Sequence, residues 1–310
     1  GNLKKAKKML RLAAEADVDV IKFQIYTGDK LVNKNISPKR NNHFKKFELS
    51  INQHIELAKL CKRFKKKYLA SVWDNQSLQK LNNYLNFFKV GSGDLTAYPL
   101  LKQLSNYNKP IILSTGLSNF REIDHAVKFI RKNPFYKKKN NLALLQCTSD
   151  YPTSDNEVNL SAMSKLSKLT KTVGYSNHNI GDLALVTAYC LGAQILEFHF
   201  TDDRNNKIFR DHKISLTKTE TINLIEKIKR IRKFKKKNFN KPTAGERNSG
   251  NIRSFRRAVY LNKDLRKGSI IKFKDLDFLR PNIGLDARNF KKILGKKLKV
   301  NIKKNQKIRI

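Results

Sequence analysis

The feature that most restricts the fold is a regular alternation of short apolar runs with amphipathic stretches along the first 240 residues. The apolar runs have the length of strands, and the stretches between them have helical periodicity. Strands are predicted at 18–24, 68–73, 87–90, 110–113, 142–146, 171–174 and 194–200. Helices are predicted at 3–16, 51–66, 122–132, 160–169, 182–190 and 218–232, with a long polar loop before residue 51. Such an alternation predicts an α/β protein with a parallel sheet covered by helices.

The number of strands restricts the architecture further. A closed (β/α)8 TIM barrel has eight parallel strands in about 250 residues, and here the helix at 3–16 has no strand before it. We therefore expect residues 1–240 to form a (β/α)8 TIM barrel whose first strand is missing from this chain. We also expect upstream coding sequence that supplies this strand.

Beyond residue 240 the pattern changes to short β-rich pieces. The segment 243–247 reads as a linker-like turn, and glycines interrupt the remainder of the chain. β pieces are predicted at 258–261, 269–272, 296–300 and 307–310, without a long amphipathic helix. The sequence thus predicts a second, small β domain over 245–310.

The charge of the chain raises a different possibility. It has 66 Lys and Arg against 25 Asp and Glu, a formal net charge of +41, and such a surface attracts anionic substrates or nucleic acid. The basic residues are spread over the whole length, without zinc-finger spacing, an RNP-type aromatic motif or a long basic tail. Nucleic acid is therefore not the favoured partner. A non-enzymatic anion- or nucleic-acid-binding protein on a degenerate barrel stays as the alternative.

The number of cysteines and the length of the apolar runs bear on where in the cell the protein is found. Cys61, Cys147 and Cys190 are an odd number without metal-ligand spacing, which favours a reducing compartment such as the cytoplasm. No apolar run reaches the roughly 18 residues that span a bilayer, so we expect no membrane partner.

Polar side chains gather where the predicted strands end. In a β/α barrel the active-site groups lie at the carboxyl ends of strands, and residues i and i+2 share a face. Lys22 and Gln24 share a face at the end of the first visible strand. Ser176 and His178 follow a later strand, and Glu197 and His199 end the last one. A single polar strand end often only meets solvent, but three equivalent pairs favour a site.

His178 and His199 are the metal-ligand candidates, because neighbouring strand ends would bring two imidazoles to one ion. His43, His54 and His125 are expected on the surface, and His212 is left open.

Two strand exits are rich in glycine and hydroxyl residues. Lys89 precedes the turn that carries Ser92 and Asp94, and Ser114 begins the next turn. Small residues let backbone N–H groups approach an anion, and a lysine supplies charge, so these turns are phosphate-binding candidates. Asp94 would orient a lysine or shuttle a proton, although a turn-capping role explains it equally well.

Several ordered motifs resemble the N-acetylneuraminate (sialic acid) synthase family, whose relatives make legionaminate and pseudaminate. They are IKFQ at 21–24, FKVGSGD at 88–94, IILSTG at 111–116, QCTSDYPT at 146–153, GYSNH at 174–178 and EFHFT at 197–201. The tail, with LRPNIGL at 279–285, resembles the antifreeze-like (SAF) domain of that family. The resemblance covers essentially the whole chain. It implies a transferase that condenses phosphoenolpyruvate with N-acetylmannosamine or a related acylamino-hexose and releases phosphate.

The resemblance also implies roles for individual residues. His178 and His199 would bind Mn2+ or Mg2+. Phosphoenolpyruvate would be held by Lys22, Ser71, Lys89, Ser92, Ser114, Ser149 and Ser176. The sugar would face Gln24, Tyr151 and Asp211, and Arg280 would reach its acyl group from the partner subunit of a domain-swapped homodimer.

The chain departs from the family pattern in several places, including its first strand and the residue before His178. The family's first strand carries a glutamate thought to act as acid or base, and the similarity begins after that strand. Asn177 stands before the first metal-binding histidine, where the family often has Asp.

Overall fold

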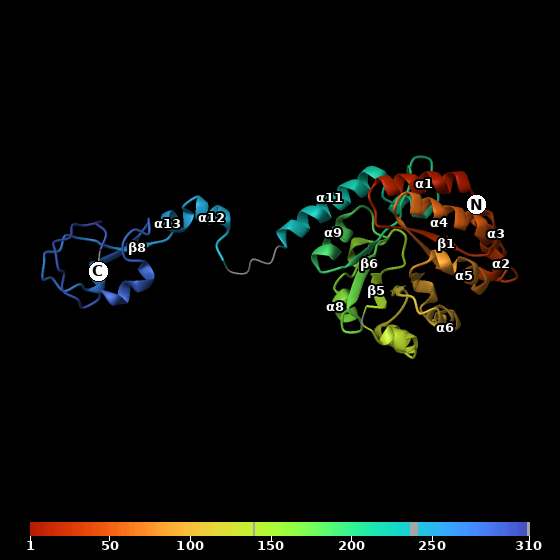
Figure 1. Ribbon diagram of the computed structural model, residues 1–310, viewed down its shortest axis with the longest axis horizontal. Helices are drawn as coiled ribbons and strands as arrows, with labels where there is room; N and C mark the ends of the chain where they lie inside the picture. The colour runs from red at the N-terminus through yellow and green to blue at the C-terminus, as the bar shows by residue number, and fades with distance from the viewer. Residues whose placement is uncertain (139, 236–240, 309–310) are drawn as a thin grey trace. The chain divides into compact units, whose positions relative to one another are not determined.

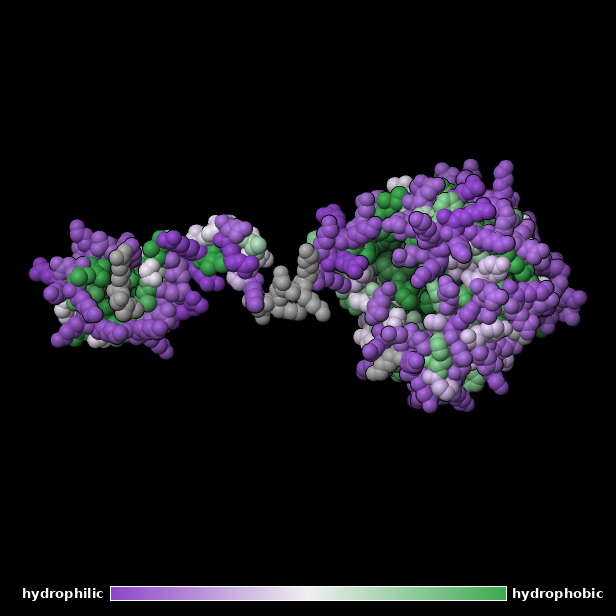
Figure 2. Space-filling view, in the orientation of Figure 1, coloured by the Kyte–Doolittle hydropathy of each residue, from purple (hydrophilic) through white to green (hydrophobic). Residues whose placement is uncertain are grey.

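The computed structural model describes residues 1–138, 140–235 and 241–308. The chain divides into two compact units, Gly1–Lys235 and Lys236–Ile310 (Figure 1). Hydrophilic residues cover most of the visible face of each unit, and a recess in the first unit has hydrophobic residues at its floor (Figure 2).

The first unit is built on a seven-stranded sheet whose order follows the chain from β1 to β7. All neighbouring strands are parallel. The strands are β1 (Val20–Ile25), β2 (Lys67–Val72), β3 (Phe88–Val90), β4 (Ile111–Ser114), β5 (Leu142–Cys147), β6 (Thr172–Ser176) and β7 (Ile195–Glu197). The predicted parallel β/α sheet is thus confirmed, as a curled half-barrel with β1 and β7 as its edge strands.

Helices follow the strands and cover the sheet. Those that flank the strands are α1 (Leu3–Glu15), α4 (Ile51–Arg63), α5 (Asn75–Leu81), α6 (Tyr98–Asn106), α7 (Phe120–Ile130), α8 (Ala162–Leu166), α9 (Leu183–Cys190) and α11 (Lys218–Phe234). Three of them, α4, α7 and α11, begin with a capping box, in which the N-cap side chain and the third helical residue satisfy each other's backbone N–H groups. Their apolar faces and the sheet form one buried core.

The first and last elements of this unit lie together. Helix α1 lies against both α4 and α11 (Figure 1). Lys8 Nζ is 3.0 Å from Asp202 Oδ2, and Lys229 Nζ is 3.2 Å from Asp17 Oδ2. The sheet therefore curls until its two ends approach each other.

The segment between β1 and α4 is not the plain polar loop that the sequence predicts, because it contains α2 (Gly28–Leu31) and α3 (Pro38–Phe47). The prediction failed here because α3 has charged or amide side chains on nearly every face, so the apolar periodicity that marks a helix is absent. The segment is organised by the buried Asn41, whose Nδ2 donates to Gly28 O at 3.1 Å and to Val32 O at 2.9 Å.

The second unit has its own small core. Strands β8 (Ala258–Leu261) and β9 (Leu276–Leu279) pair antiparallel, and β9 was not predicted. The pieces expected at 269–272 and 296–300 are not strands, but they pair through an antiparallel bridge between Ile270 and Lys297 and through backbone hydrogen bonds on either side of it. Lys307 bridges to Tyr260. Residues 309 and 310 of the last expected piece lie outside the described residues.

The segment expected as a linker-like turn is also different in the structure. Residues 243–247 are mostly helical, in α12 (Ala244–Asn248), and α13 (Asn251–Phe255) follows. Thr243 and Glu246 form a capping box that starts α12 in place of a turn. Within the described ranges, none of the helices is long and apolar enough to cross a membrane.

Candidate active site

Three charged side chains from separate strands meet inside the half-barrel. Lys22 Nζ on β1 lies 2.9 Å from Glu197 Oε1 on β7, and Lys89 Nζ on β3 lies 3.3 Å from Glu197 Oε2. Lys89 is buried and also donates to Ser114 Oγ at 2.7 Å. One carboxylate is thus shared by two ammonium groups from two other strands of the barrel segment. With both lysines protonated, this cluster carries one net positive charge.

The electrostatics keep the carboxylate ionised. Burial alone would raise the pKa of Glu197, but Lys22 and Lys89 outweigh it and hold this pKa well below its ordinary value. Burial lowers the pKa of Lys89, and the negative charge of Glu197 opposes that shift. A lysine with a lowered pKa next to a fixed carboxylate can bind an anion or exchange a proton.

The two candidate metal-binding histidines lie side by side. The ring centroids of His178 and His199 are 5.4 Å apart. Burial lowers the pKa of both rings, that of His199 to about 3, so both are neutral at pH 7. His178 Nδ1 lies 2.6 Å from the Thr148 carbonyl oxygen, which can only accept, so this nitrogen carries the proton. The Nε2 of His178 is left with a free lone pair.

Tyr151 forms a wall of the same site. Its ring centroid is 4.0 Å from that of His178 and 5.9 Å from that of His199. Asp211 Oδ2 is 3.7 Å from His199 Nδ1. Burial raises the pKa of Asp211, and the guanidinium of Arg210 acts in the opposite direction.

Serine hydroxyls form a second group, around Gly116. The backbone N–H of Gly116 donates to Ser92 Oγ at 3.1 Å. A Cβ at this glycine would lie 2.5 Å from Ser149 Oγ and 2.8 Å from Ser92 Oγ, so the site has no room for a side chain. An adjoining cavity of about 470 Å³ is bordered by Gly116, Ser149 and Lys165. Small residues, hydroxyls and an N–H group of this kind suit an oxyanion.

Four more residues predicted for the site, Gln24, Ser71, Asp94 and Ser176, lie near the cluster of charged side chains. Strand register puts Gln24 beside Ser71 and Ser71 beside Lys89, while Ser176 pairs with Glu197. Ser71 and Ser176 are buried, whereas Gln24 is exposed. Burial raises the pKa of Asp94, and a hydrogen bond from Trp73 and the charge of Lys89 oppose the rise.

Arg280 is the one predicted site residue in the second unit. It follows β9, is exposed, and its guanidinium carbon lies 5.7 Å from the centroid of the Phe255 ring.

Two histidines differ from expectation or resolve an open question. His54 was expected on the surface but is buried, with 1% of its surface exposed, because α4 turns it inward to Tyr68 Oη at 2.9 Å from its Nδ1. His212, which was left open, has its Nδ1 2.9 Å from Thr201 Oγ1 and is part of a loop contact.

Sequence reasoning missed some residues that the structure brings to the site. Glu197 was expected at the barrel mouth as one member of a strand-end pair, but no role in the site was assigned to it. Cys147 Sγ is buried 3.7 Å from His178 Nδ1, and the Arg210 guanidinium carbon is 4.4 Å from the centroid of the Tyr151 ring. Strand alternation could have suggested Cys147, because Cys147 pairs with Ser176 in register. No signal marked Arg210, since it begins the short helix α10 (Arg210–Ile214) within the long connection from β7 to α11.

Seven parallel strands in chain order, with paired Lys, Glu and His side chains at their carboxyl ends, define a β/α-barrel protein with its site at the barrel mouth. The comparisons with known proteins agree. The NeuB family matches residues 9–239, and the SAF domain matches residues 256–310. The chain belongs to the NeuB family and ends in a SAF domain, as its resemblance implied.

Individual relatives cover nearly the whole chain. It is 36% identical to the N,N'-diacetyllegionaminic acid synthase of Campylobacter jejuni, over 100% of this chain and 95% of the relative. It is 32% identical to the protein of the same name from Legionella pneumophila, over 97% and 88%. A crystal structure of N-acetylneuraminic acid (sialic acid) synthetase from Leptospira borgpetersenii, in complex with citrate, superposes with a TM-score of 0.73. That protein is 29% identical, and the match covers 82% of this chain and 87% of the other.

Proposed function

We propose that this chain is a sialic-acid-type (nonulosonate) synthase, a transferase that joins phosphoenolpyruvate to an acylamino-hexose and releases phosphate. The observation that carries the proposal is the cluster of Lys22, Lys89 and Glu197 beside His178 and His199. The relatives named as legionaminic and sialic acid synthases supply the reaction class.

The anionic substrate is assigned to the lysine side of the site. Lys22 and Lys89 offset the phosphate and carboxylate charges of phosphoenolpyruvate, and Ser71, Ser92 and Ser114 donate hydroxyl hydrogen bonds. Ser149 and Ser176 complete this set. The support is geometric: Lys89 donates to Ser114 Oγ, and Ser92 and Ser149 flank Gly116, where no side chain fits.

The metal is assigned to the histidine side. His178 and His199 fit a divalent cation because both rings are neutral and the Nε2 of His178 has a free lone pair. Among the described residues, no group of three or more His, Cys, Asp or Glu side chains is arranged to hold a metal. A cation here would therefore take its other ligands from water and substrate oxygens. Bound Mn2+ or Mg2+ would act as a Lewis acid that polarises the sugar aldehyde.

The residues then divide the chemistry between them. Carbon 3 of phosphoenolpyruvate attacks the aldehyde carbon, and positive character develops at carbon 2. Glu197, kept ionised by its two lysines, stabilises this positive character, while Asp94 orients Lys89. Water adds at carbon 2, and the carbon–oxygen bond to phosphate breaks. Gln24, Tyr151 and Asp211 face the sugar.

We further propose that 1–240 and 245–310 act as the synthase and antifreeze-like domains of a domain-swapped homodimer, in which Arg280 of one subunit reaches the sugar in the other. Large exposed apolar side chains in the loops and first helical residues that follow the strands support such an assembly, because they need covering. They are Ile36, Leu117, Phe120, Ile180, Leu183, Ile208 and Phe209. A cytoplasmic location fits the three free cysteines.

The test measures phosphate release from phosphoenolpyruvate by the purified protein. N-acetylmannosamine and a diacetamido-trideoxyhexose are compared as acceptors, each with and without Mn2+ or Mg2+. Release that requires both an acceptor and a metal supports the proposal, and the faster acceptor identifies the sugar class. A folded, metal-loaded protein that releases no phosphate with either sugar would overturn it.

A further inference from the structure

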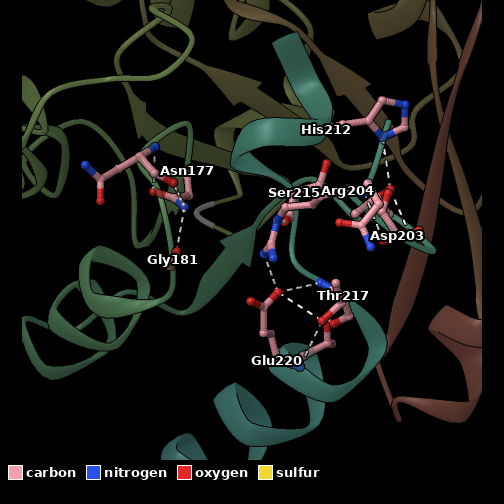
Figure 3. A network of polar contacts seen from close by, with 12 residues as sticks. Asn177, Gly181, Asp203, Arg204, His212, Ser215, Thr217 and Glu220 are labelled. Carbon is pink, nitrogen blue, oxygen red and sulfur yellow. Dashed lines mark hydrogen bonds and ion pairs between the residues drawn. The ribbon is translucent and has the colours of Figure 1, made fainter. Parts of the chain in front are cut away.

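The loop from β7 to α11, residues 198–217, is fixed by polar contacts at both ends (Figure 3). Near its start, Thr201 Oγ1 lies 2.9 Å from His212 Nδ1. Near its end, Arg204 Nε donates to Ser215 O at 3.1 Å, and the same guanidinium pairs with Glu220. These contacts hold the two ends of the loop to each other and to α11.

The turn before α10 (Arg210–Ile214) is anchored a second time, on the second helix after β1. The ring of Phe209 stacks on that of His43 in α3, with centroids 5.4 Å apart and an interplanar angle of 22°. On the other side, Asp211 faces His199. The residue between these two anchors, Arg210, has little freedom in where its side chain begins.

Arg210 uses that position to cover Tyr151. Its guanidinium carbon is 4.4 Å from the centroid of the Tyr151 ring, and its Nε is 3.5 Å from Asp211 Oδ1. The Tyr151 ring in turn lies 4.0 Å from that of His178. Arginine over an aromatic face is an attractive contact that also fixes the ring plane. The Arg210 side chain is 65% exposed, so it adds little to the core.

We propose that Arg210 is a positioning residue for the acceptor sugar: it fixes the Tyr151 ring beside His178 and so shapes the wall on which the acylamino-hexose binds. This inference rests on the proposed function and deepens it. The anionic substrate is assigned to Lys22 and Lys89, so Arg210 acts on the acceptor and not on phosphoenolpyruvate.

The test compares Arg210→Gln and Arg210→Lys with Lys213→Gln, which removes a charge from the exposed Lys213 of the same short helix. Arg210→Gln is expected to raise KM for the acceptor about tenfold, with the KM for phosphoenolpyruvate unchanged. Arg210→Lys keeps a cation over the ring, so its KM for the acceptor is expected to stay close to the wild-type value. Lys213→Gln behaves as the wild type, and all three variants keep the wild-type Tm.

A double-mutant cycle assigns the effect to the stacked pair. In a Tyr151→Leu background, Arg210→Gln changes acceptor binding by less than about twofold, because the ring it orders is gone. Calorimetric titration with N-acetylmannosamine and with the diacetamido-trideoxyhexose gives the same comparison without turnover.

The inference is overturned if Arg210→Gln leaves acceptor binding unchanged, or weakens phosphoenolpyruvate binding by the same factor. A wild type that binds a sugar but releases no phosphate would contradict the proposed function alone, and one that binds neither sugar would contradict both.

Discussion

Lys22 on β1 and Glu197 on β7 form an ion pair of 2.9 Å, although these are the two edge strands of the sheet and 175 positions separate them in the chain. The contact requires the sheet to curl so far that its edges face each other. The same carboxylate also meets Lys89 from β3. The same ion pairs therefore hold the two edge strands near each other and form part of the candidate site.

Replacing Glu197 by Gln should therefore affect both activity and stability. The neutral amide leaves the buried Lys89 without its counter-charge, so we expect the free energy of unfolding to fall by about 1–3 kcal/mol. Turnover should fall at least about a hundredfold, because the site loses its fixed negative charge. The control is Glu56→Gln, which breaks only the surface pair with Lys7 and should change stability by less than about 1 kcal/mol. Urea unfolding and steady-state kinetics measure both effects, and equal results for the two variants would contradict the prediction.

Gly116→Ala should impair phosphoenolpyruvate binding without unfolding the protein. The added methyl would lie 2.5 Å from Ser149 Oγ and 2.8 Å from Ser92 Oγ, so these hydroxyls must move. We expect KM for phosphoenolpyruvate to rise about tenfold, with KM for the acceptor unchanged. Gly245→Ala in the second unit is the control, since a Cβ there meets only Thr243 Oγ1, at 3.9 Å. If both exchanges behave alike, the hydroxyls around Gly116 do not hold the anion.

Removal of the histidines should remove the metal. His178→Ala and His199→Ala are expected to lower bound Mn2+ to background and to abolish metal-dependent turnover, because two imidazoles are the proposed protein ligands. His125→Ala changes an exposed histidine on α7 and serves as the control. Metal content after dialysis, measured by inductively coupled plasma mass spectrometry, gives a readout that is independent of activity. Full metal content in either site variant would refute the ligand assignment.

The stability of the first unit should decrease in mild acid because of His54. Burial lowers the pKa of His54 from 6.5 to about 4. Between these values the unfolded chain binds a proton that the folded chain does not, so stability is complete above pH 6.5 and is lost as the pH falls towards 4. The loss from this residue is on the order of 3 kcal/mol. Urea midpoints at several pH values should fall less steeply in His54→Gln than in the wild type, while His125→Gln keeps the wild-type slope. Identical slopes for all three proteins would count against this account.

The sheet could be predicted from the sequence because buried strands such as β5 are continuous apolar runs. The helices α4 and α7 were equally visible, since apolar residues recur on one face. Helix α3 was not, because it is organised by one buried amide, Asn41, and not by an apolar stripe. Strand β9 was missed because Asp277 interrupts its apolar run, whereas the equally short β8 is apolar throughout.

The candidate site was predictable where it depends on single strands. Alternation placed Lys22, His178 and His199 towards the barrel mouth, and the structure brings them to one site. The ion pair between Lys22 and Glu197 was not predictable, because the distance between edge strands depends on the curl of the whole sheet. Arg210 escaped notice for another reason: its position is set by loop contacts such as that of Arg204 with Ser215, and loops carry no periodic pattern.

The order of the strands has a consequence for how the protein folds. Each strand pairs only with its neighbours along the chain, so most of the sheet can assemble from segments that are closer in sequence than its two ends are. The pair of Lys22 with Glu197, and that of Lys229 with Asp17, instead join the first and last parts of the unit. Bringing these distant segments together has the largest loop-closure entropy, so we expect it late in folding. A nascent chain or a partly folded intermediate would then have most of its secondary structure but not the candidate site. Recovery of activity during refolding would therefore report the step that brings β1 and β7 together.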